Sequence, residues 1–369
     1  MKKRLLIITG ERSGLESILP AVLKTDQNTR QSISIVATDY SSVPLELRSN
    51  IMIPSTTGLN INPELLSMYL KTLSDIINYI KVNAITDILF VDNPEFNLLL
   101  SRILHTMGNK LYYFIIPQVW AWRYYRINYL KKYFNKVFVI FPFEEELLKR
   151  ESINVKFVGH PKYEQIKLLC LPNGIKEKLG INPKNKVISL FPGTRESILK
   201  RQFDIFENSA HLLAEKLPNY RIVISDIRRK NTFKKGKIIY TNEKALHILS
   251  ISNFAIISSG STTMEAAFLN VPFLGIYIPD LLTYSVGRIL VKLNSTLMPN
   301  ILLNERFIPE LVSPYLSQDE IVKACYQIIT NKSHIKTIKK KLSLVSKPFE
   351  GYTTSEIMSE EIKNILTQN

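Results

Sequence analysis

Short apolar runs rich in β-branched residues alternate with longer helical patterns along this 369-residue chain, and the alternation starts twice. The first series of expected strands covers residues 4–9, 33–37, 88–91, 112–116 and 137–140. The second series covers residues 186–191, 221–225, 237–240, 254–258 and 273–277. Strands that lack polar alternation and are separated by helices form parallel sheets covered on both faces. The sequence therefore predicts an α/β protein with two Rossmann-like lobes, each built on a parallel sheet, and a cleft between the lobes.

The boundary between the two series falls near residues 171–174, which read LPNG. We expect a first lobe over residues 1–165 and a second lobe over residues 166–345. The remaining segment, 346–369, contains a helical pattern that can pack back on the first lobe. In open α/β sheets, ligands bind outside the carboxyl ends of the strands. Residues that directly follow an expected strand are therefore the first candidates for a site.

The chain carries an excess of positive charge, with 48 Lys and Arg against 32 Asp and Glu, a formal net charge of +16. Three stretches without acidic residues hold much of this charge, namely 123–136, 228–237 and 332–347. Such stretches are either an ordinary solvated surface or a surface that attracts anionic lipid or phosphorylated ligands. A nucleic-acid partner is not expected, because no helix-turn-helix, zinc-finger or RNA-binding aromatic motif accompanies the charge.

No segment is expected to cross a membrane or to direct secretion. The longest apolar stretch, residues 111–122, has about twelve residues, whereas a spanning helix needs about 20. The amino-terminal residues lack the longer apolar run and the small-residue cleavage site of a secretory signal. Two cysteines, Cys170 and Cys325, suit a reducing compartment. We therefore expect a cytoplasmic protein, part of which can lie on a membrane surface.

Common nucleotide and metal motifs are missing from the sequence. It has no G-x-x-x-x-G-K-[ST] loop, no G-x-G-x-x-G after the first expected strand and no H-E-x-x-H. It also lacks an Asp-x-Asp pair, the kind of carboxylate cluster that holds a divalent metal. We expect neither a cofactor nor a metal. A nucleotide diphosphate, if it binds, must be neutralised by backbone amides and by Arg or Lys.

The first expected strand leads into the sequence GERSG. Two glycines let a ligand approach the backbone, and a hydroxyl with free amides at a helix start can hold a polar group. An ordinary strand-to-helix turn would have the same sequence. The candidate binding residues of this loop are Gly10, Glu11, Ser13 and Gly14.

The sequence DNPEFN follows another expected strand and begins with Asp92. This carboxylate is a candidate general base, and its alternative role is that of a helix cap. Pro94 suits the first turn of the helix that follows. Asn97, in the same block, is a candidate binding residue.

Both tryptophans, Trp120 and Trp122, occur within three residues in the sequence PQVWAWR. Such a pair packs in a core or faces a ligand, and Trp122 is our candidate for binding. The segment 124–133 mixes aromatic and basic residues as an interfacial helix does, and a basic surface helix would have the same pattern. His160 follows a short strand in the sequence VGHP and is either a cleft residue or a structural one.

Two loops of the second half have the composition of phosphate sites. Gly193, Thr194 and Arg195 follow an expected strand and precede a helix, so arginine and helix-start amides can grip a diphosphate without a metal. The sequence SSGSTTMEAA opens another helix, and its hydroxyls and amides suit phosphate oxygens, whereas its glutamate can bind ribose hydroxyls. The candidates in this second loop are Ser259, Gly260, Ser261, Thr262, Thr263 and Glu265.

The segment 299–311 is rich in polar residues and prolines. Asn300 and Arg306 are candidate ligand contacts there, and the alternative is a plain connecting loop.

Taken together, these motifs resemble those of the lipid-A-disaccharide synthases, GT-B glycosyltransferases of lipopolysaccharide assembly. The similarity covers most of the chain and comprises DNPEFN, PQVWAWR, FPFE, VGHP, LFPGTR, SSGSTTMEAA with NVP, and MPNILLNERFIPEL. The VWAWR and PNxL…R…PEL segments are specific to that family, whereas the SGxxTxEA loop is shared more widely among UDP-sugar enzymes.

The resemblance implies an inverting transfer of 2,3-diacylglucosamine from UDP to the 6-hydroxyl of 2,3-diacylglucosamine 1-phosphate (lipid X). It implies that Asp92 is the base and that Arg195 steadies the departing UDP. It also places 261–265 in the nucleotide loop, Asn300 and Arg306 in the donor region, and the loop 10–14 beside the acceptor. Acylated substrates imply peripheral attachment to the cytoplasmic face of the inner membrane, and an oligomer is compatible with the family.

The chain departs from the family pattern on the acceptor side. Leu15 stands where the first loop usually has aspartate, Glu95 replaces an aspartate, and Gln118 replaces a serine. Residues 51–80 match poorly. Two alternatives stay open: another GT-B transferase or 2-epimerase acting on UDP-N-acetylglucosamine, and a non-catalytic lipid-binding paralogue.

Overall fold

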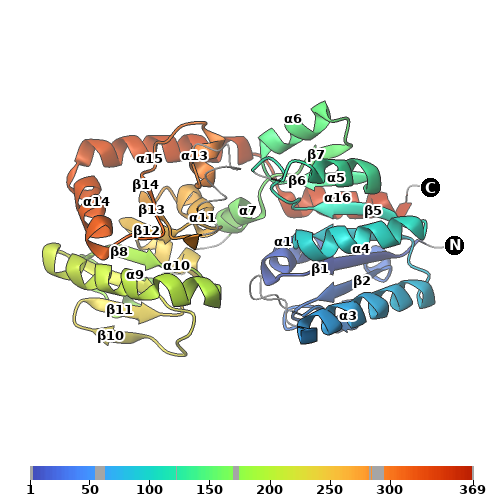
Figure 1. Cartoon of the computed structure of the whole chain (residues 1–369), viewed down its shortest axis with the longest axis horizontal. Helices are drawn as coiled ribbons and strands as arrows, with labels where there is room; N and C mark the ends of the chain where they lie inside the picture. Colours follow the sequence, from blue (N-terminus) through green and yellow to red (C-terminus); the bar gives the residue numbers. More distant parts are fainter. Residues whose placement is uncertain are drawn as a thin grey trace. The chain divides into compact units, whose positions relative to one another are not determined.

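The computed structural model describes residues 3–54, 63–121, 123–168, 174–281, 284 and 295–367. The chain forms two compact units. One unit consists of Met1–Glu164 together with Gly351–Asn369, and the other of Gln165–Glu350. Figure 1 colours the elements of both units along the sequence.

Among the residues that the structure describes, a seven-stranded parallel sheet forms the centre of the first unit. Its strands are β1 (Leu5–Thr9), β2 (Ile33–Ala37), β3 (Arg48–Met52), β4 (Asp87–Val91), β5 (Lys110–Phe114), β6 (Lys136–Val139) and β7 (Val155–Phe157). They are ordered β3-β2-β1-β4-β5-β6-β7. Strands such as β1 and β4 are buried at every position. Strands that are buried in this way require helices on both faces of the sheet.

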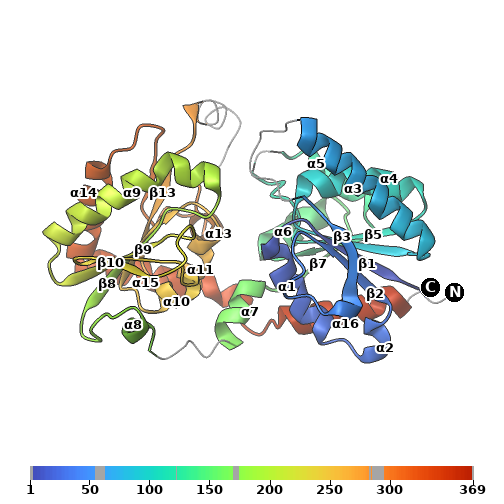
Figure 2. The same cartoon turned by 90° about the horizontal axis from the view of Figure 1, so that it is seen from below.

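Helices supply that cover on both faces. They are α1 (Arg12–Leu23), α2 (Gln27–Arg30), α3 (Pro63–Val82), α4 (Pro94–Thr106), α5 (Arg126–Tyr133), α6 (Pro142–Arg150) and α16 (Thr354–Thr367), with the short 3-10 helix η1 (Leu45–Leu47). Helix α7 (Pro161–Leu168) runs across the boundary between the units. Helices α1 and α16 pack against each other on one face of the sheet, whereas α3, α4 and α5 lie on the other (Figure 2).

The carboxyl-terminal helix α16 completes the core of the first unit. Met358, Ile362 and Ile365 belong to the same buried cluster as residues of β1 and α1. On another side of α16, the carboxylate of Glu361 accepts hydrogen bonds from Nζ of Lys136 (2.7 Å) and of Lys156 (2.8 Å). The helix is therefore held by apolar burial and by ion pairs to β6 and β7, the last two strands at one edge of the sheet.

Replacing Glu361 by glutamine is expected to lower the free energy of unfolding at neutral pH by about 1–2 kcal/mol, since two lysines lose their anionic partner. Burial alone would raise the pKa of Glu361, but the hydrogen bonds and charges of Lys136 and Lys156 hold it below its ordinary value. The contribution is therefore present above the ordinary glutamate pKa and is lost as the pH falls through the lowered value. Urea unfolding at neutral and acidic pH measures this, with the exposed neighbour Glu360→Gln as control; equal losses in both variants would contradict the prediction.

A second seven-stranded sheet forms the centre of the other unit. Its strands are β8 (Lys186–Phe191), β9 (Tyr220–Ser225), β10 (Phe233–Lys235), β11 (Ile238–Thr241), β12 (Phe254–Ser258), β13 (Phe273–Tyr277) and β14 (Glu310–Val312). They are ordered β10-β11-β9-β8-β12-β13-β14. Within the described ranges, only the edge pair β10–β11 is antiparallel. Exposed Lys234 and Lys235 on β10 discourage further strand pairing at this edge.

The helices of this unit are α8 (Ile175–Lys178), α9 (Glu196–Lys216), α10 (Ala245–Ser250), α11 (Thr262–Phe268), α13 (Met298–Leu302), α14 (Gln318–Thr330), α15 (Lys332–Ser346) and the 3-10 helix η2 (Lys347–Phe349). Helix α9 packs against α14, and α11 packs against α13 and α15 (Figure 1). The predicted α/β architecture with two largely parallel sheets is confirmed. No helix among the described residues is long and apolar enough to span a bilayer.

Candidate active site

The order of the first sheet places the loops after β1 and β4 beside each other. These strands are neighbours, with Thr9 paired to Val91 at their carboxyl ends. From this point the chain proceeds to β2 on one side and to β5 on the other. A crevice outside such a switch point is where open α/β sheets bind ligands. The predicted loop 10–14 and the predicted base Asp92 both follow strands of this switch point.

Asp92 has an unusual backbone conformation that its surroundings hold in place. Asp92 and Asn93 both have positive φ angles, 52° and 43°. The carbonyl of Asp92 accepts hydrogen bonds from Asn97 Nδ2 (2.5 Å) and from the Tyr113 hydroxyl (2.8 Å), and its N–H donates to Phe114 (3.1 Å). Strained conformations of this kind persist where the surrounding structure fixes them, and they are frequent at functional sites.

The carboxylate of Asp92 lies next to the first loop. Ser13 Oγ donates a hydrogen bond to Asp92 Oδ2 at 3.5 Å. A Cβ atom on Gly10 would lie 1.7 Å from Nδ2 of Asn93, and one on Gly14 would lie 3.4 Å from the Cβ of Asp92. Gly10 therefore allows the loop to approach the Asp92–Asn93 segment closely, whereas Gly14 lies at ordinary contact distance from Asp92. Glu11 lies between the two glycines as the residue before α1.

Asn97 has a structural use for its amide. Its side chain is fully buried, and Nδ2 donates to the carbonyl groups of Asp92 and Val91. Asn97 thus holds the end of β4 in place. This function differs from the direct ligand contact that the sequence suggested.

Three further motifs of the first unit meet at the ends of β5, β6 and β7. Trp120 Nε1 donates to the buried carboxylate of Glu144 (3.1 Å), and the Trp120 ring packs edge-on against Phe143. Phe141 packs against His160, whose Nδ1 accepts the backbone N–H of Lys162. The candidate Trp122 lies outside the described residues.

Burial determines the charge states in this aromatic cluster. Burial, and then the nearby charge of Lys162, lowers the pKa of His160 to about 3, so its ring is neutral at physiological pH. Burial raises the pKa of Glu144 to about 7, against the hydrogen bonds that it accepts. His160 can therefore offer a substrate only a neutral imidazole.

Glu95 links the DNPEFN block to the segment after the tryptophans. Its carboxylate accepts hydrogen bonds from Arg123 Nη1 and from the buried Arg126 Nη2, each at 2.6 Å. Burial opposes ionisation, yet the two guanidinium groups hold the pKa of Glu95 below its ordinary value. The ion pairs fix the start of α5 against the start of α4, next to Asp92.

The second sheet repeats the arrangement of the first. Its switch point lies between β8 and β12, which are paired at Phe191 and Ile257. Gln202 Nε2, buried on α9, donates both to the Pro192 carbonyl (2.5 Å) and to Ser258 Oγ (2.6 Å). This amide ties the two loops together. The predicted residues Gly193, Thr194 and Arg195 are thus brought beside the predicted loop 259–263.

The loop after β8 ends with an arginine at the amino terminus of a helix. Gly193 has a φ of 103°, a conformation that favours glycine, and Arg195 is the residue before α9. Thr194 and Arg195 are exposed. The amino terminus of the long helix α9 and the guanidinium therefore both favour an anion.

The loop after β12 has an accessible part and a buried part. Ser259, Gly260, Ser261 and Thr262 retain exposure, whereas Thr263 and Glu265 are buried. The Thr263 hydroxyl donates to the Gly260 carbonyl at 2.7 Å and so closes the turn. The accessible groups with which this loop can hold an anion are hence those of 259–262.

The segment that carries Asn300 and Arg306 is joined to this loop. Ser259 Oγ donates to the Thr296 carbonyl (3.2 Å), and both the N–H and the hydroxyl of Thr296 donate to Glu310. Arg306 is exposed, and its Nε lies 3.7 Å from the other oxygen of Glu310. The structure therefore places Arg306 near the 259–262 loop.

Asn300 corrects an expectation. Only 1 % of it is exposed; its Nδ2 donates to Ser295 Oγ and to the Ile308 carbonyl, and its Oδ1 accepts the Ile308 N–H. Both N–H donors and the carbonyl oxygen of this side chain are thus engaged inside the protein. Asn300 shapes the loop rather than contacting a ligand, because its side chain is buried and its two donors are already used.

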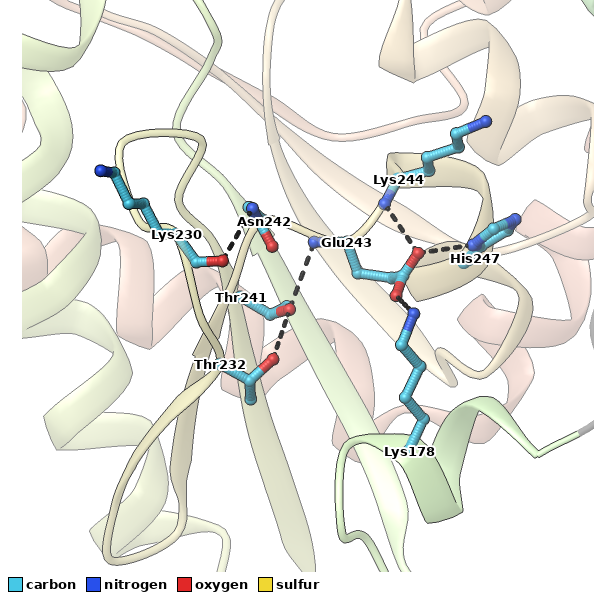
Figure 3. A network of polar contacts seen from close by, with 8 residues as sticks. All are labelled: Lys178, Lys230, Thr232, Thr241, Asn242, Glu243, Lys244 and His247. Atoms are coloured by element: carbon cyan, nitrogen blue, oxygen red, sulfur yellow. Dashed lines mark hydrogen bonds and ion pairs between the residues drawn. The ribbon is translucent and has the colours of Figure 1, made fainter.

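A polar network at the end of β11 was not predicted from the sequence. Figure 3 shows that Lys178 of α8 and His247 of α10 converge on the carboxylate of Glu243; His247 Nδ1 lies 2.7 Å from Oε1. The Lys178 hydrogen bond is the main cause that lowers the pKa of Glu243 to about 2; burial opposes it, and His247 adds to it. This network fixes the loop that follows β11 at the same sheet edge as the loops after β8 and β12. The available signal was an acidic residue three positions after the end of the expected strand 237–240.

No group of three or more His, Cys, Asp and Glu side chains that could hold a metal ion occurs in the part of the chain that the structure describes.

A family model described as "Lipid-A-disaccharide synthetase" matches residues 8–362. The chain belongs to the lipid-A-disaccharide synthase family. It is therefore a glycosyltransferase of lipid A biosynthesis by family.

Curated relatives agree with this family. The lipid-A-disaccharide synthase of Geobacter metallireducens is 25% identical over 354 residues, 93% of this chain and 92% of the relative. Lipid-A-disaccharide synthase 1 of Legionella pneumophila (strain Lens) is 29% identical over 321 residues, 84% of this chain and 83% of the relative.

Solved structures show the fold. The UDP-GlcNAc 2-epimerase from Neisseria meningitidis bound to UDP-GlcNAc matches with a TM-score of 0.66 and 15% identity, covering 99% of this chain and 100% of that one. The S. aureus MnaA–UDP complex matches with a TM-score of 0.65 and 15% identity, covering 100% of this chain and 98% of that one. The synthase has the two-lobed α/β fold of GT-B enzymes, as the motifs predicted.

Proposed function

We propose that this synthase transfers 2,3-diacylglucosamine from its UDP derivative to the 6-hydroxyl of 2,3-diacylglucosamine 1-phosphate. The products are UDP and a β-1,6-linked disaccharide 1-phosphate. The observation that carries the proposal is the pairing, through Gln202, of the Arg195 loop with the 259–262 loop at the β8–β12 switch point. This is the type of position at which open α/β sheets bind nucleotides.

The donor half of the proposal rests on the second unit. Arg195, the amino terminus of α9 and the hydroxyls of 259–262 supply positive charge and donors for a pyrophosphate. Arg306, joined to this loop through Glu310 and Thr296, supplies further charge. The solved relatives include proteins bound to UDP-GlcNAc and to UDP, which is compatible with this assignment.

The acceptor half of the proposal rests on the first unit. The carboxylate of Asp92 removes the proton of the acceptor's 6-hydroxyl while the hydroxyl oxygen attacks the anomeric carbon of the donor sugar. The bond between that carbon and the UDP oxygen breaks in the same displacement, so the anomeric configuration inverts. Arg195 stabilises the negative charge that develops on UDP. Ser13, Gly10, Glu11 and Gly14 shape the loop beside the base.

A transfer assay with radiolabelled donor and lipid X tests this function. The expected product is the disaccharide 1-phosphate, and NMR spectroscopy of its anomeric proton should show the β configuration. A different sugar product would favour another UDP-sugar enzyme. Absence of any product from the folded protein would favour the lipid-binding paralogue.

We also propose that the synthase attaches peripherally to the inner-membrane surface from the cytoplasm, because both proposed substrates are acylated. The first unit offers a suitable face along α4 and α5. Leu99, Ile103, Tyr124 and Tyr125 are exposed there, and exposed lysines follow on α5. Aromatic and aliphatic side chains beside basic ones are typical of interfacial helices.

A further inference from the structure

A long lysine-rich stretch lies in the second unit, outside every motif assigned above. Between residues 321 and 349 the chain contains no Asp or Glu. It contains seven lysines in the same interval: Lys323, Lys332, Lys336, Lys339, Lys340, Lys341 and Lys347. Such an interval has strong positive potential, because it has no acidic neighbours in sequence.

The helical repeat of α15 places four of these lysines on one side of the helix. Its buried residues are Ile338, Leu342 and Val345, and the helix packs against α11 and α13. At about 100° per residue, the four lysines 332, 336, 339 and 340 fall within a sector of about 100° that faces away from the buried side. All four are exposed, and so is Lys347 in the 3-10 turn that follows. We call these five residues the α15 lysine stripe.

The pairing of Lys341 supports this division. It lies outside the sector and forms an ion pair with Glu305. Among the described residues, no ion pair is present for the five members of the α15 lysine stripe. Leu344, beside the stripe, is 40 % exposed. The stripe is therefore a line of uncompensated charges about 22 Å long with an apolar side chain at its margin.

We propose that the α15 lysine stripe is a docking surface for a bilayer that contains anionic lipid. The proposal rests on the proposed function, in which acylated substrates reside in a membrane. Lysine suits this partner, since its compact charge reaches headgroups while its stem covers apolar surface. A nucleic acid fits less well, because the stripe has neither arginine for bidentate phosphate contacts nor aromatic rings on which bases could stack. The second unit would thus have a membrane contact of its own.

The test compares two variants of the full chain with the same change in net charge. One carries Lys332→Glu, Lys336→Glu and Lys340→Glu, and the control carries Lys184→Glu, Lys216→Glu and Lys235→Glu, which are exposed elsewhere in the same unit. Sedimentation with phosphatidylcholine vesicles, with or without phosphatidylglycerol, measures binding. We expect the stripe variant to bind the anionic vesicles at least about tenfold more weakly than the control at low salt. High salt should abolish the difference.

Equal binding of the two variants to anionic vesicles would overturn the proposal. So would wild-type binding to single-stranded RNA that is as tight as binding to vesicles and equally lost in the stripe variant. Thermal unfolding checks both variants, and a Lys→Gln set at the stripe positions replaces the Lys→Glu set if that set unfolds. Transfer activity on detergent-dispersed substrates should be the same in both variants. An inactive wild type would contradict the proposed reaction, whereas the vesicle comparison would still test whether the α15 lysine stripe binds anionic membranes.

Discussion

Replacing Asp92 by asparagine is expected to lower kcat by about 100-fold or more while the free energy of unfolding changes little. Asparagine keeps the volume of the side chain but cannot accept the proton of the attacking hydroxyl. It also tolerates the left-handed backbone at this position, where φ is 52°. The contacts of the Asp92 carbonyl with Asn97 and Tyr113 involve the backbone and remain possible.

Transfer rates at saturating donor and acceptor, together with urea unfolding, measure this effect. Asp92→Ala serves as the comparison, because alanine removes the same proton acceptor and adds backbone strain at a positive φ. We expect both variants to be slow and the alanine variant to be less stable as well. Near-normal kcat in Asp92→Asn would exclude Asp92 as the base.

Replacing Arg195 by alanine is expected to weaken UDP binding by about 10- to 100-fold, the scale of a lost charge-assisted hydrogen bond. The guanidinium stands directly before α9, at the β8–β12 switch point. Its loss leaves the pyrophosphate with the neutral donors of the two loops and with Arg306 as the one remaining assigned cation. Uridine, which lacks the pyrophosphate, should bind the variant and the wild type with similar affinity.

Isothermal titration calorimetry with UDP and with uridine measures both affinities. Lys200→Ala is the matched control, since Lys200 is an exposed cation on the same helix and pairs with Glu196. Its UDP affinity should equal that of the wild type. If Arg195→Ala bound UDP as tightly as the control, the pyrophosphate assignment would be wrong.

Much of the fold could be predicted from the sequence, because buried parallel strands have a local signature. The runs that became β1, β8 and β12 are apolar and β-branched, and each ends at a polar or glycine-containing loop. Strand β3 was missed, since its sequence RSNIM has no such run. The antiparallel β10 was missed for the same reason, because its three residues FKK are all exposed.

Part of the candidate site was predictable and part was not. Asp92, Arg195 and the 259–262 loop have chemistry that a sequence reveals through residue type and position after a strand. Asn300 and His160 have polar groups as well, but burial commits the first to its own loop and keeps the second neutral. Gln202 and Glu243 position loops through contacts with residues distant in sequence. No local pattern distinguishes such residues from solvated polar ones.

Most strands, the loops that follow them and the chemical groups in those loops could be predicted from the sequence, because these depend on interactions between near neighbours in the chain. Which strands are adjacent, and therefore which loops share a switch point, became clear from the three-dimensional structure alone. Strand order depends on the packing of whole sheets and helices, to which distant segments contribute together. The meeting of the loop after β8 with the loop after β12, and of the loop after β1 with Asp92, is a consequence of that order.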